Sequence, residues 1–110
     1  MANIYKNEKT SLTNTDLTTL YTVPGNSRAI VKSILAAEDA AGSAVVKVTL
    51  VDASSNIFVL DNQVSLSANE KEQVSSEPLI MMESEILKVQ ASSGNVDVIA
   101  SVLEINREDR

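Results

Sequence analysis

Apolar and polar residues alternate with a period of two along the C-terminal third of the chain, and this pattern restricts the fold more than any other feature. Two sets of apolar residues show it: Leu87, Val89 and Ala91, then Val96, Val98, Ala100 and Val102. A strand repeats every second residue, whereas a helix repeats about every 3.6. Gly94, between the sets, can supply the positive φ of a tight turn. We therefore expect residues 86–91 and 96–105 to pair as an antiparallel hairpin, preceded by a short strand after Pro78.

The rest of the chain shows the same pattern in shorter segments. We expect strands over residues 17–23, 28–37, 44–51, 57–60 and 73–76, with Val64 and Leu66 continuing the pattern after residue 60. Pro24 and Gly25 predict a type II turn in which Gly25 takes a positive φ. About seven or eight strands, spaced roughly ten residues apart, are typical of an all-β antiparallel sandwich, jelly-roll or immunoglobulin-like.

The sequence divides into one domain and two polar ends. Residues 17–105 form the expected β-sandwich domain, and residues 106–110 (NREDR) a solvated tail. Residues 1–16 lack a sustained period, and three alternatives remain open for them: a frayed terminus, an arm that orders on a neighbouring subunit, or an edge strand. The Ala-rich residues 33–42 could be taken for a helix, but Ile30, Val31, Ile34 and Leu35 favour a strand.

Composition excludes several classes of function. The net charge of −6 argues against binding nucleic acid or anionic lipid, which require Lys and Arg. No apolar run approaches the roughly 18 residues of a membrane span, and the N-terminal residues do not resemble a signal peptide. The chain has no Cys and no His, so disulfides are impossible, and the commonest metal ligand and general base are missing.

Side-chain combinations that carry catalysis are also missing. The paired carboxylates Glu38/Asp39 and Glu83/Glu85 fall in expected turns, where water would hold them near their ordinary acidity. A serine nucleophile needs an activating base, and no Ser-x-x-Lys motif is present. We expect no enzyme activity, no cofactor and no metal, against the rival hypothesis of a hydrolase that uses Glu83 and Glu85. In the pair Met81-Met82, we expect one side chain inside and one outside.

Two strands carry apolar residues on both faces, and this is the feature that points to an interaction. A sandwich strand normally has one wet face, so a second apolar face needs cover. Either the chain's own loops and N-terminal residues cover it, or a partner subunit does. The candidate residues for a contact with another subunit or a larger shell are Ile30, Ile34, Ile99, Leu103 and Ile105.

Three segments resemble a family of small β-sandwich structural proteins of tailed bacteriophages, especially phages of marine bacteria. They are LYTVPGNSRAIVKSILAAED, VTLVD and PLIMMESEILKVQASSGNVDVIASVLEI. The resemblance extends over roughly residues 17–105 and rests on alternating apolar motifs, which are moderately specific. Residues 81–85 depart from it, because members of that family often carry an acidic-Gly turn at this place.

The resemblance implies a virion component with no catalytic residues, made in the host cytoplasm and present in many copies. Decoration or cementing of the capsid surface is the first expectation. A neck, tail or tail-fibre component, or a receptor-binding module at the tail tip, is the alternative. The expected partners are copies of the chain itself, in a trimer because local three-fold axes abound on capsids, and the major capsid protein or another virion protein. No nucleic acid, membrane or small-molecule substrate is expected.

Overall fold

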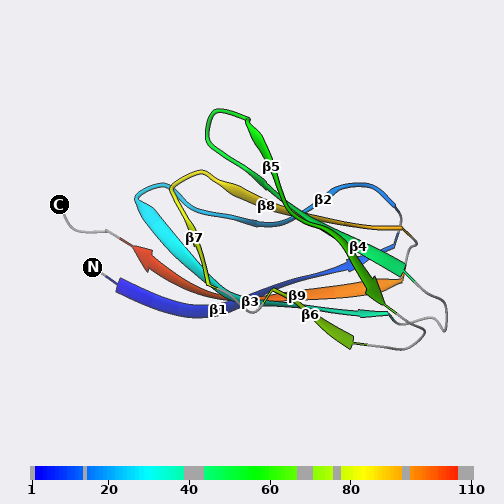
Figure 1. Ribbon diagram of the computed structural model, residues 1–110. Helices are drawn as coiled ribbons and strands as arrows, with labels where there is room; N and C mark the ends of the chain where they lie inside the picture. Colours follow the sequence, from blue (N-terminus) through cyan, green and yellow to red (C-terminus); the bar gives the residue numbers. More distant parts are fainter. Residues whose placement is uncertain are drawn as a thin grey trace.

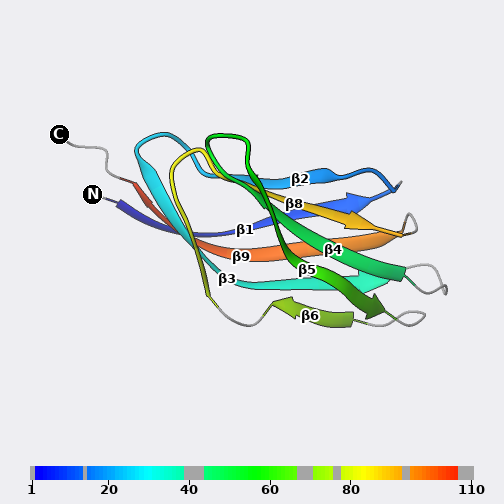
Figure 2. The same cartoon turned by 45° about the horizontal axis from the view of Figure 1, so that its top comes forward.

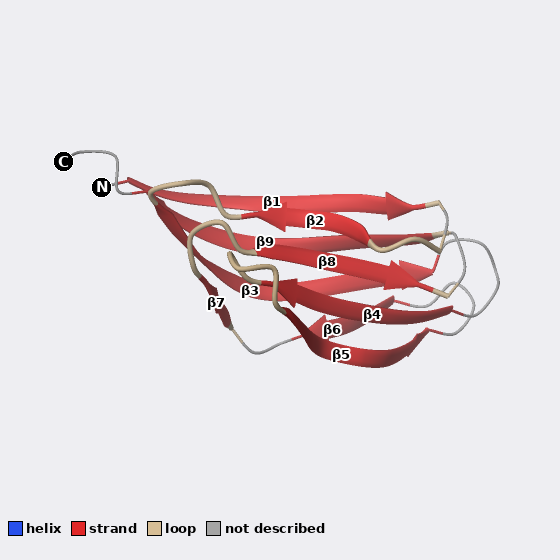
Figure 3. Ribbon diagram, turned by 90° about the horizontal axis from the view of Figure 1, so that it is seen from above, coloured by secondary structure: helices blue, strands red, loops and turns tan. Residues whose placement is uncertain are grey.

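The described residues form nine β-strands and no helix in a computed structural model (Figure 3). The structure describes residues 2–13, 15–38, 44–66, 71–75, 78–92 and 95–106. This part of the chain holds no helix that could cross a membrane. The strands are β1 (Ala2–Leu12), β2 (Thr18–Thr22), β3 (Ser27–Glu38), β4 (Ala44–Val51), β5 (Ile57–Leu66), β6 (Lys71–Ser75), β7 (Leu79–Met81), β8 (Ile86–Ala91) and β9 (Val96–Asn106).

The strands make two antiparallel sheets that pack face to face (Figure 1). The five-stranded sheet has the order β1-β9-β3-β6, with β7 also paired to β3, and Figure 2 shows the four strands of this order side by side. The four-stranded sheet has the order β2-β8-β4-β5. The predicted all-β antiparallel sandwich is therefore confirmed.

The core lies between the two sheets and is filled by the alternate residues that the sequence pattern identified. Val96, Val98, Ala100 and Val102 of β9 are buried, as are Leu87, Val89 and Ala91 of β8. Aliphatic side chains dominate the core, and Tyr21 is its one aromatic residue among those described. Met81 is buried and Met82 is exposed, so the prediction of one methionine inside and one outside is confirmed.

The predicted hairpin between residues 86–91 and 96–105 is wrong. β8 pairs with β2 and β4 in the four-stranded sheet, whereas β9 pairs with β1 and β3 in the five-stranded sheet. The chain crosses from one layer to the other between them (Figure 1), so their apolar sides face each other across the core. Alternation identifies the buried side of each strand but does not say whether two such strands are neighbours or face each other. Gly94 lies outside the described residues.

The turn after β2 also differs from the prediction. Gly25, the one glycine among the described residues, does not have a positive φ and therefore does not take the type II position. Asn26 has a φ of 62° instead, and asparagine tolerates the left-handed region better than most residues. The backbone nitrogen of Asn26 donates a hydrogen bond to Glu83 Oε2 at 2.9 Å, which ties this turn to the turn between β7 and β8.

The N-terminal residues form the edge strand β1, one of the three alternatives left open by the sequence. Its register with β9 runs without a break from Ala2, opposite Asn106, to Leu12, opposite Val96. β9 therefore extends to Asn106, and residues 107–110 lie outside the described part of the chain. β6, at the opposite edge of the same sheet, corresponds to the weak edge strand predicted near residues 73–76.

Candidate functional site

An apolar row crosses the outer face of the five-stranded sheet. Tyr5 of β1 pairs with Leu103 of β9, Leu103 pairs with Ile30 of β3, and Ile30 pairs with Ile80 of β7. Directly paired residues place their side chains on the same face of a sheet, so these four strands together present a continuous row. Tyr5 is 78% exposed and Ile80 is 66% exposed, which leaves the two ends of the row in water.

Apolar residues on both sides of this row extend the surface toward the ends of the sheet. Ile99 of β9 pairs with Leu35 of β3, and both side chains are exposed. Ile105 pairs with Arg28 near the other end of the two strands. We call this surface the outer face. Its apolar residues are Tyr5, Ile30, Leu35, Ile80, Ile99, Leu103 and Ile105.

Four of the five residues predicted for a contact lie on the outer face, but the prediction is wrong for Ile34. Ile34 is only 1% exposed and belongs to the core. The reason is a β-bulge in β3: Val31 pairs with Val102, and the next paired residue is Ser33, opposite Ser101. The extra residue, Lys32, shifts every following side chain to the opposite face. Leu35 therefore takes the outer position that the sequence pattern gave to Ile34.

Three residues of the outer face were missed by the sequence analysis. Tyr5 lies on a strand whose period of two was not recognised. Tyr5 and Lys9 are four residues apart, so they point to the same face of that strand. Ile80 lies on a strand of three residues, which is too short for a periodic signal. Leu35 depends on the bulge, and no residue of the sequence marks that position.

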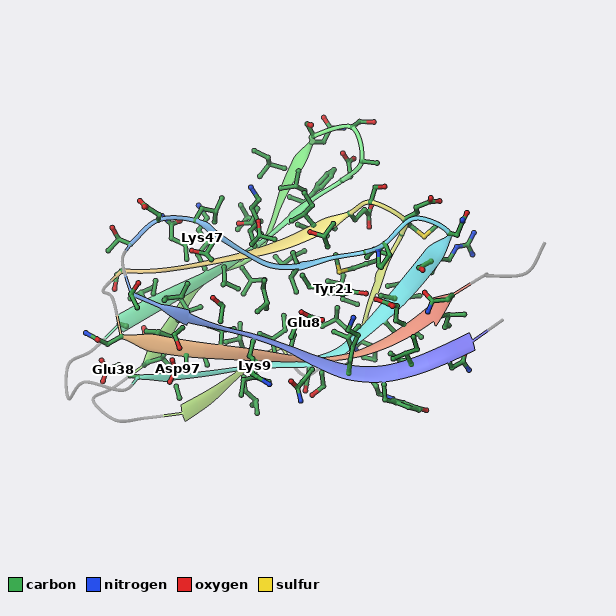
Figure 4. All side chains as sticks on the ribbon, turned by 180° about the vertical axis from the view of Figure 1, so that it is seen from behind. Glu8, Lys9, Tyr21, Glu38, Lys47 and Asp97 are labelled. Atoms are coloured by element: carbon green, nitrogen blue, oxygen red, sulfur yellow. The ribbon has the colours of Figure 1, made fainter. Side chains whose placement is uncertain are left out.

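The outer face also carries charged residues. Lys9 pairs with Ile99, Arg28 pairs with Ile105, and both are exposed. Asp97 is also on this face and accepts a hydrogen bond from the Ser11 hydroxyl at 2.7 Å. Figure 4 shows Lys9 and Asp97 pointing away from the sandwich on the side of the five-stranded sheet.

A second apolar surface lies at the beginning of β5. The residues Ile57, Phe58, Val59 and Leu60, here called the β5 tip, are consecutive, and their side chains are between 39% and 66% exposed. β5 is an edge strand of the four-stranded sheet. Figure 1 shows the β4–β5 connection rising from that sheet, away from the five-stranded sheet.

The loop that carries the β5 tip is held by one carboxylate. Asp52 Oδ1 accepts hydrogen bonds from the backbone nitrogens of Ser54 and Asn56, each at 2.9 Å. The Asn56 side chain donates to Asp52 Oδ2 at 3.2 Å. The backbone bond from Asn56, with smaller help from the other two, lowers the pKa of Asp52 below its ordinary value. A closed loop of this kind fixes the start of β5.

A cluster of polar side chains, with Tyr21 and Glu104 buried and Lys6 and Glu8 half-buried, links the edge strand β1 to the core. The Tyr21 hydroxyl donates a hydrogen bond to Glu104 Oε2 at 2.6 Å, and Lys6 Nζ lies 3.5 Å from the same oxygen and 3.3 Å from Glu8 Oε2. Figure 4 shows Tyr21 and Glu8 between the two sheets. Desolvation and the bond to Glu104 raise the pKa of Tyr21. Burial alone would lower the pKa of Lys6, but the two carboxylates outweigh it and raise that pKa. The buried carboxylate of Glu104 therefore has both a hydrogen-bond donor, Tyr21, and a counter-ion, Lys6.

The paired carboxylates of the sequence have structural positions. Glu83 accepts the bond from Asn26 described above, and Glu85 Oε1 accepts one from the backbone nitrogen of Met82 at 2.8 Å. Glu38 was expected in a solvated turn, but it is the last residue of β3 and only 4% exposed; Asp39 lies outside the described residues. Among the described residues, no group of three or more acidic side chains could hold a metal ion.

Comparison with known proteins shows a shared fold. No protein-family model and no curated protein sequence matches the chain. The chain is similar to a chain in the acidic stable capsid structure of Helicobacter pylori bacteriophage KHP30, with 12% identity and a TM-score of 0.53 over 94% of this chain and 87% of that one. It is also similar to the Drosophila NLP core, with 16% identity and a TM-score of 0.51 over 93% of this chain and 98% of that one. The structure of that core concerns pentamer formation and histone binding.

Proposed function

We propose that this chain is a non-enzymatic structural protein of a bacteriophage virion, and that it decorates or cements the head shell. The observation that supports this best is the outer face: seven apolar residues on one face of a sheet, with Tyr5, Leu35, Ile80 and Ile99 exposed. A sheet of this kind is a docking surface, because leaving a large aliphatic side chain in water forgoes roughly 1.5–3 kcal/mol relative to burial.

Two further observations agree with this role. The fold is similar to that of a chain in a phage capsid structure, over nearly the whole length of both chains. The buried carboxylate of Glu104 is bonded within the protein: it accepts a hydrogen bond from Tyr21 and forms an ion pair with Lys6. A protein present in many copies on a particle needs a stable module with a docking face and needs no chemistry of its own.

The proposed partners follow from the same surface. The outer face contacts either a sister subunit or the major capsid protein, and the subunits form a homo-oligomer, with a trimer expected from the three-fold axes of capsids. The proposed contact residues are the four of the outer face that the sequence predicts, Ile30, Ile99, Leu103 and Ile105, together with Tyr5, Leu35 and Ile80.

Quantitative mass spectrometry of purified particles tests this function. Hundreds of copies per particle, released together with head proteins, are the expected result for a decoration protein. A few copies or tens of copies, at one vertex, would place the protein in the neck or tail instead. Absence from purified particles, in a lysate that contains the protein, would contradict the virion role.

A further inference from the structure

We propose that the β5 tip of one copy docks on the outer face of a neighbouring copy. The proposal takes its docking face from the proposed function, but it concerns association between copies in solution and does not require a virion. Each copy then covers two apolar surfaces with one kind of contact, because it offers its tip to one neighbour and its outer face to another.

The β5 tip has the structure of a docking element. Ile57 pairs with Val51 and Phe58 with Leu50, so consecutive tip residues point to opposite sides of the β4–β5 hairpin. A half-buried strand normally leaves only its polar side in water, whereas here both sides are apolar and exposed. The bonds of Asp52 hold the loop closed, so little order would have to be gained on binding.

The tip cannot cover the outer face of its own chain. It rises from the four-stranded sheet, and the outer face lies on the far side of the five-stranded sheet (Figure 1). The whole sandwich separates the two surfaces. A contact between them is therefore a contact between two molecules.

Charge favours this pairing over a contact between two tips. Asp52 is the only charged residue among residues 52–60, which form the loop and the tip. The outer face carries the exposed cations Lys9 and Arg28, and its Asp97 already accepts the bond from Ser11. Tip on outer face brings opposite charges together, whereas tip on tip would bring two Asp52 carboxylates together. Complementary charge of this kind selects the partner and its orientation more than it adds affinity.

The contact is heterologous, because it joins two different surfaces. Contacts of this type close into a ring when the rotation between neighbours permits, and otherwise continue as an open chain. The number of subunits in a ring follows from that rotation and is measured by native mass spectrometry.

The experiment uses two variants that each disrupt one surface, and a third variant as a control. Phe58→Asp charges the tip, Ile99→Asp charges the outer face, and Leu17→Asp charges an exposed apolar residue that belongs to neither surface. Sedimentation equilibrium over a range of concentrations gives the molecular mass of the species that each protein forms in solution. We expect the unchanged protein and Leu17→Asp to associate and each of the two single variants to be a monomer. An equimolar mixture of Phe58→Asp and Ile99→Asp should form a 1:1 dimer and nothing larger, because it retains one intact tip and one intact outer face.

Each other outcome overturns the proposal. Association of Ile99→Asp alone would mean that tips pair with tips, and association of Phe58→Asp alone would mean that outer faces pair. A monomeric mixture, or a monomeric unchanged protein at all concentrations, would exclude the contact. Circular dichroism checks that each variant folds, and Ile57→Asp and Tyr5→Asp are second variants at more exposed positions. The result is independent of whether the protein occurs on particles, which tests the proposed function separately.

Discussion

At the scale of single residues, Tyr21 places a titratable hydroxyl in the core, and folding raises the pKa of that hydroxyl. Its hydroxyl donates to Glu104 inside the sandwich, and its pKa is raised above the value of about 10 of an unfolded tyrosine. The folded protein therefore holds this proton more tightly than the unfolded chain. The stability gained is fully present below about pH 10 and is lost as the pH rises above it toward the folded pKa. The raised pKa of Lys6 acts in the same direction.

We predict that the free energy of unfolding falls steeply above about pH 10 and that Tyr21→Phe makes this fall shallower. Urea unfolding of the unchanged protein and of Tyr21→Phe, at a series of alkaline pH values, measures the free energy of unfolding of both. In a Tyr5→Phe background, Tyr21 is the only tyrosine, and phenolate absorbance should show it ionising above the range of a free tyrosine. Ionisation in the ordinary range would mean that the bond to Glu104 is not formed in solution.

Substitutions at two adjacent residues of β3 should differ strongly in their effect on the free energy of unfolding. Ile34 fills the core and Leu35 lies on the outer face, because of the bulge at Lys32. We predict that Ile34→Ala lowers the free energy of unfolding by about 2–5 kcal/mol, and that Leu35→Ala lowers it by about 1 kcal/mol or less. Thermal or urea unfolding compares the two. A larger loss at Leu35 would show that β3 runs without the bulge, as the sequence pattern predicted.

At the scale of elements, the sequence predicted where the strands lie but not how two of them are joined. Strand 44–51 was predicted to the residue, because a segment rich in Val lies between two polar turns. The β8–β9 connection was not predicted correctly. In a hairpin and in a crossing between the two layers alike, each strand has one apolar side and the link between the strands is short. The candidate contact residues were found where the alternation is regular, as in β9. They were missed where a bulge or a very short strand interrupts the alternation.

Engineered disulfides test the element arrangement, because the chain contains no cysteine of its own. Asn7 and Ser101 are paired residues of β1 and β9, so we predict that Asn7→Cys/Ser101→Cys forms an intrachain disulfide, which needs Cα atoms about 4.4–6.8 Å apart. Gln90 and Asp97 would be opposite each other in the hairpin, and we predict that Gln90→Cys/Asp97→Cys forms no intrachain disulfide. Thiol titration of the oxidised monomers measures both. If the second disulfide forms readily, the strands 86–91 and 96–105 pair as a hairpin after all.

At the scale of the whole molecule, the outer face determines how the protein would attach to a particle. We predict that Ile99→Asp and Leu103→Asp each lower the number of copies bound per particle, while the unfolding midpoint of the isolated domain changes little. Both residues lie on the outer face, outside the core between the sheets. Leu17→Asp is the matched control, because Leu17 is an exposed apolar residue that lies outside both the outer face and the β5 tip. Variants that unfold outright, without a separate loss of binding, would show that the outer face only stabilises the domain.

The pairing of β1 with β9 has a consequence for how the chain folds. β9 is the last strand, yet it lies between β1 and β3, so the five-stranded sheet lacks its central ladder until β9 has emerged from the ribosome. Most strand neighbours are distant in sequence, and proteins dominated by such distant pairings fold slowly, in milliseconds to seconds. During synthesis β1 is unpaired until β9 appears, and its two lysines and one glutamate, Lys6, Lys9 and Glu8, disfavour pairing with other nascent chains.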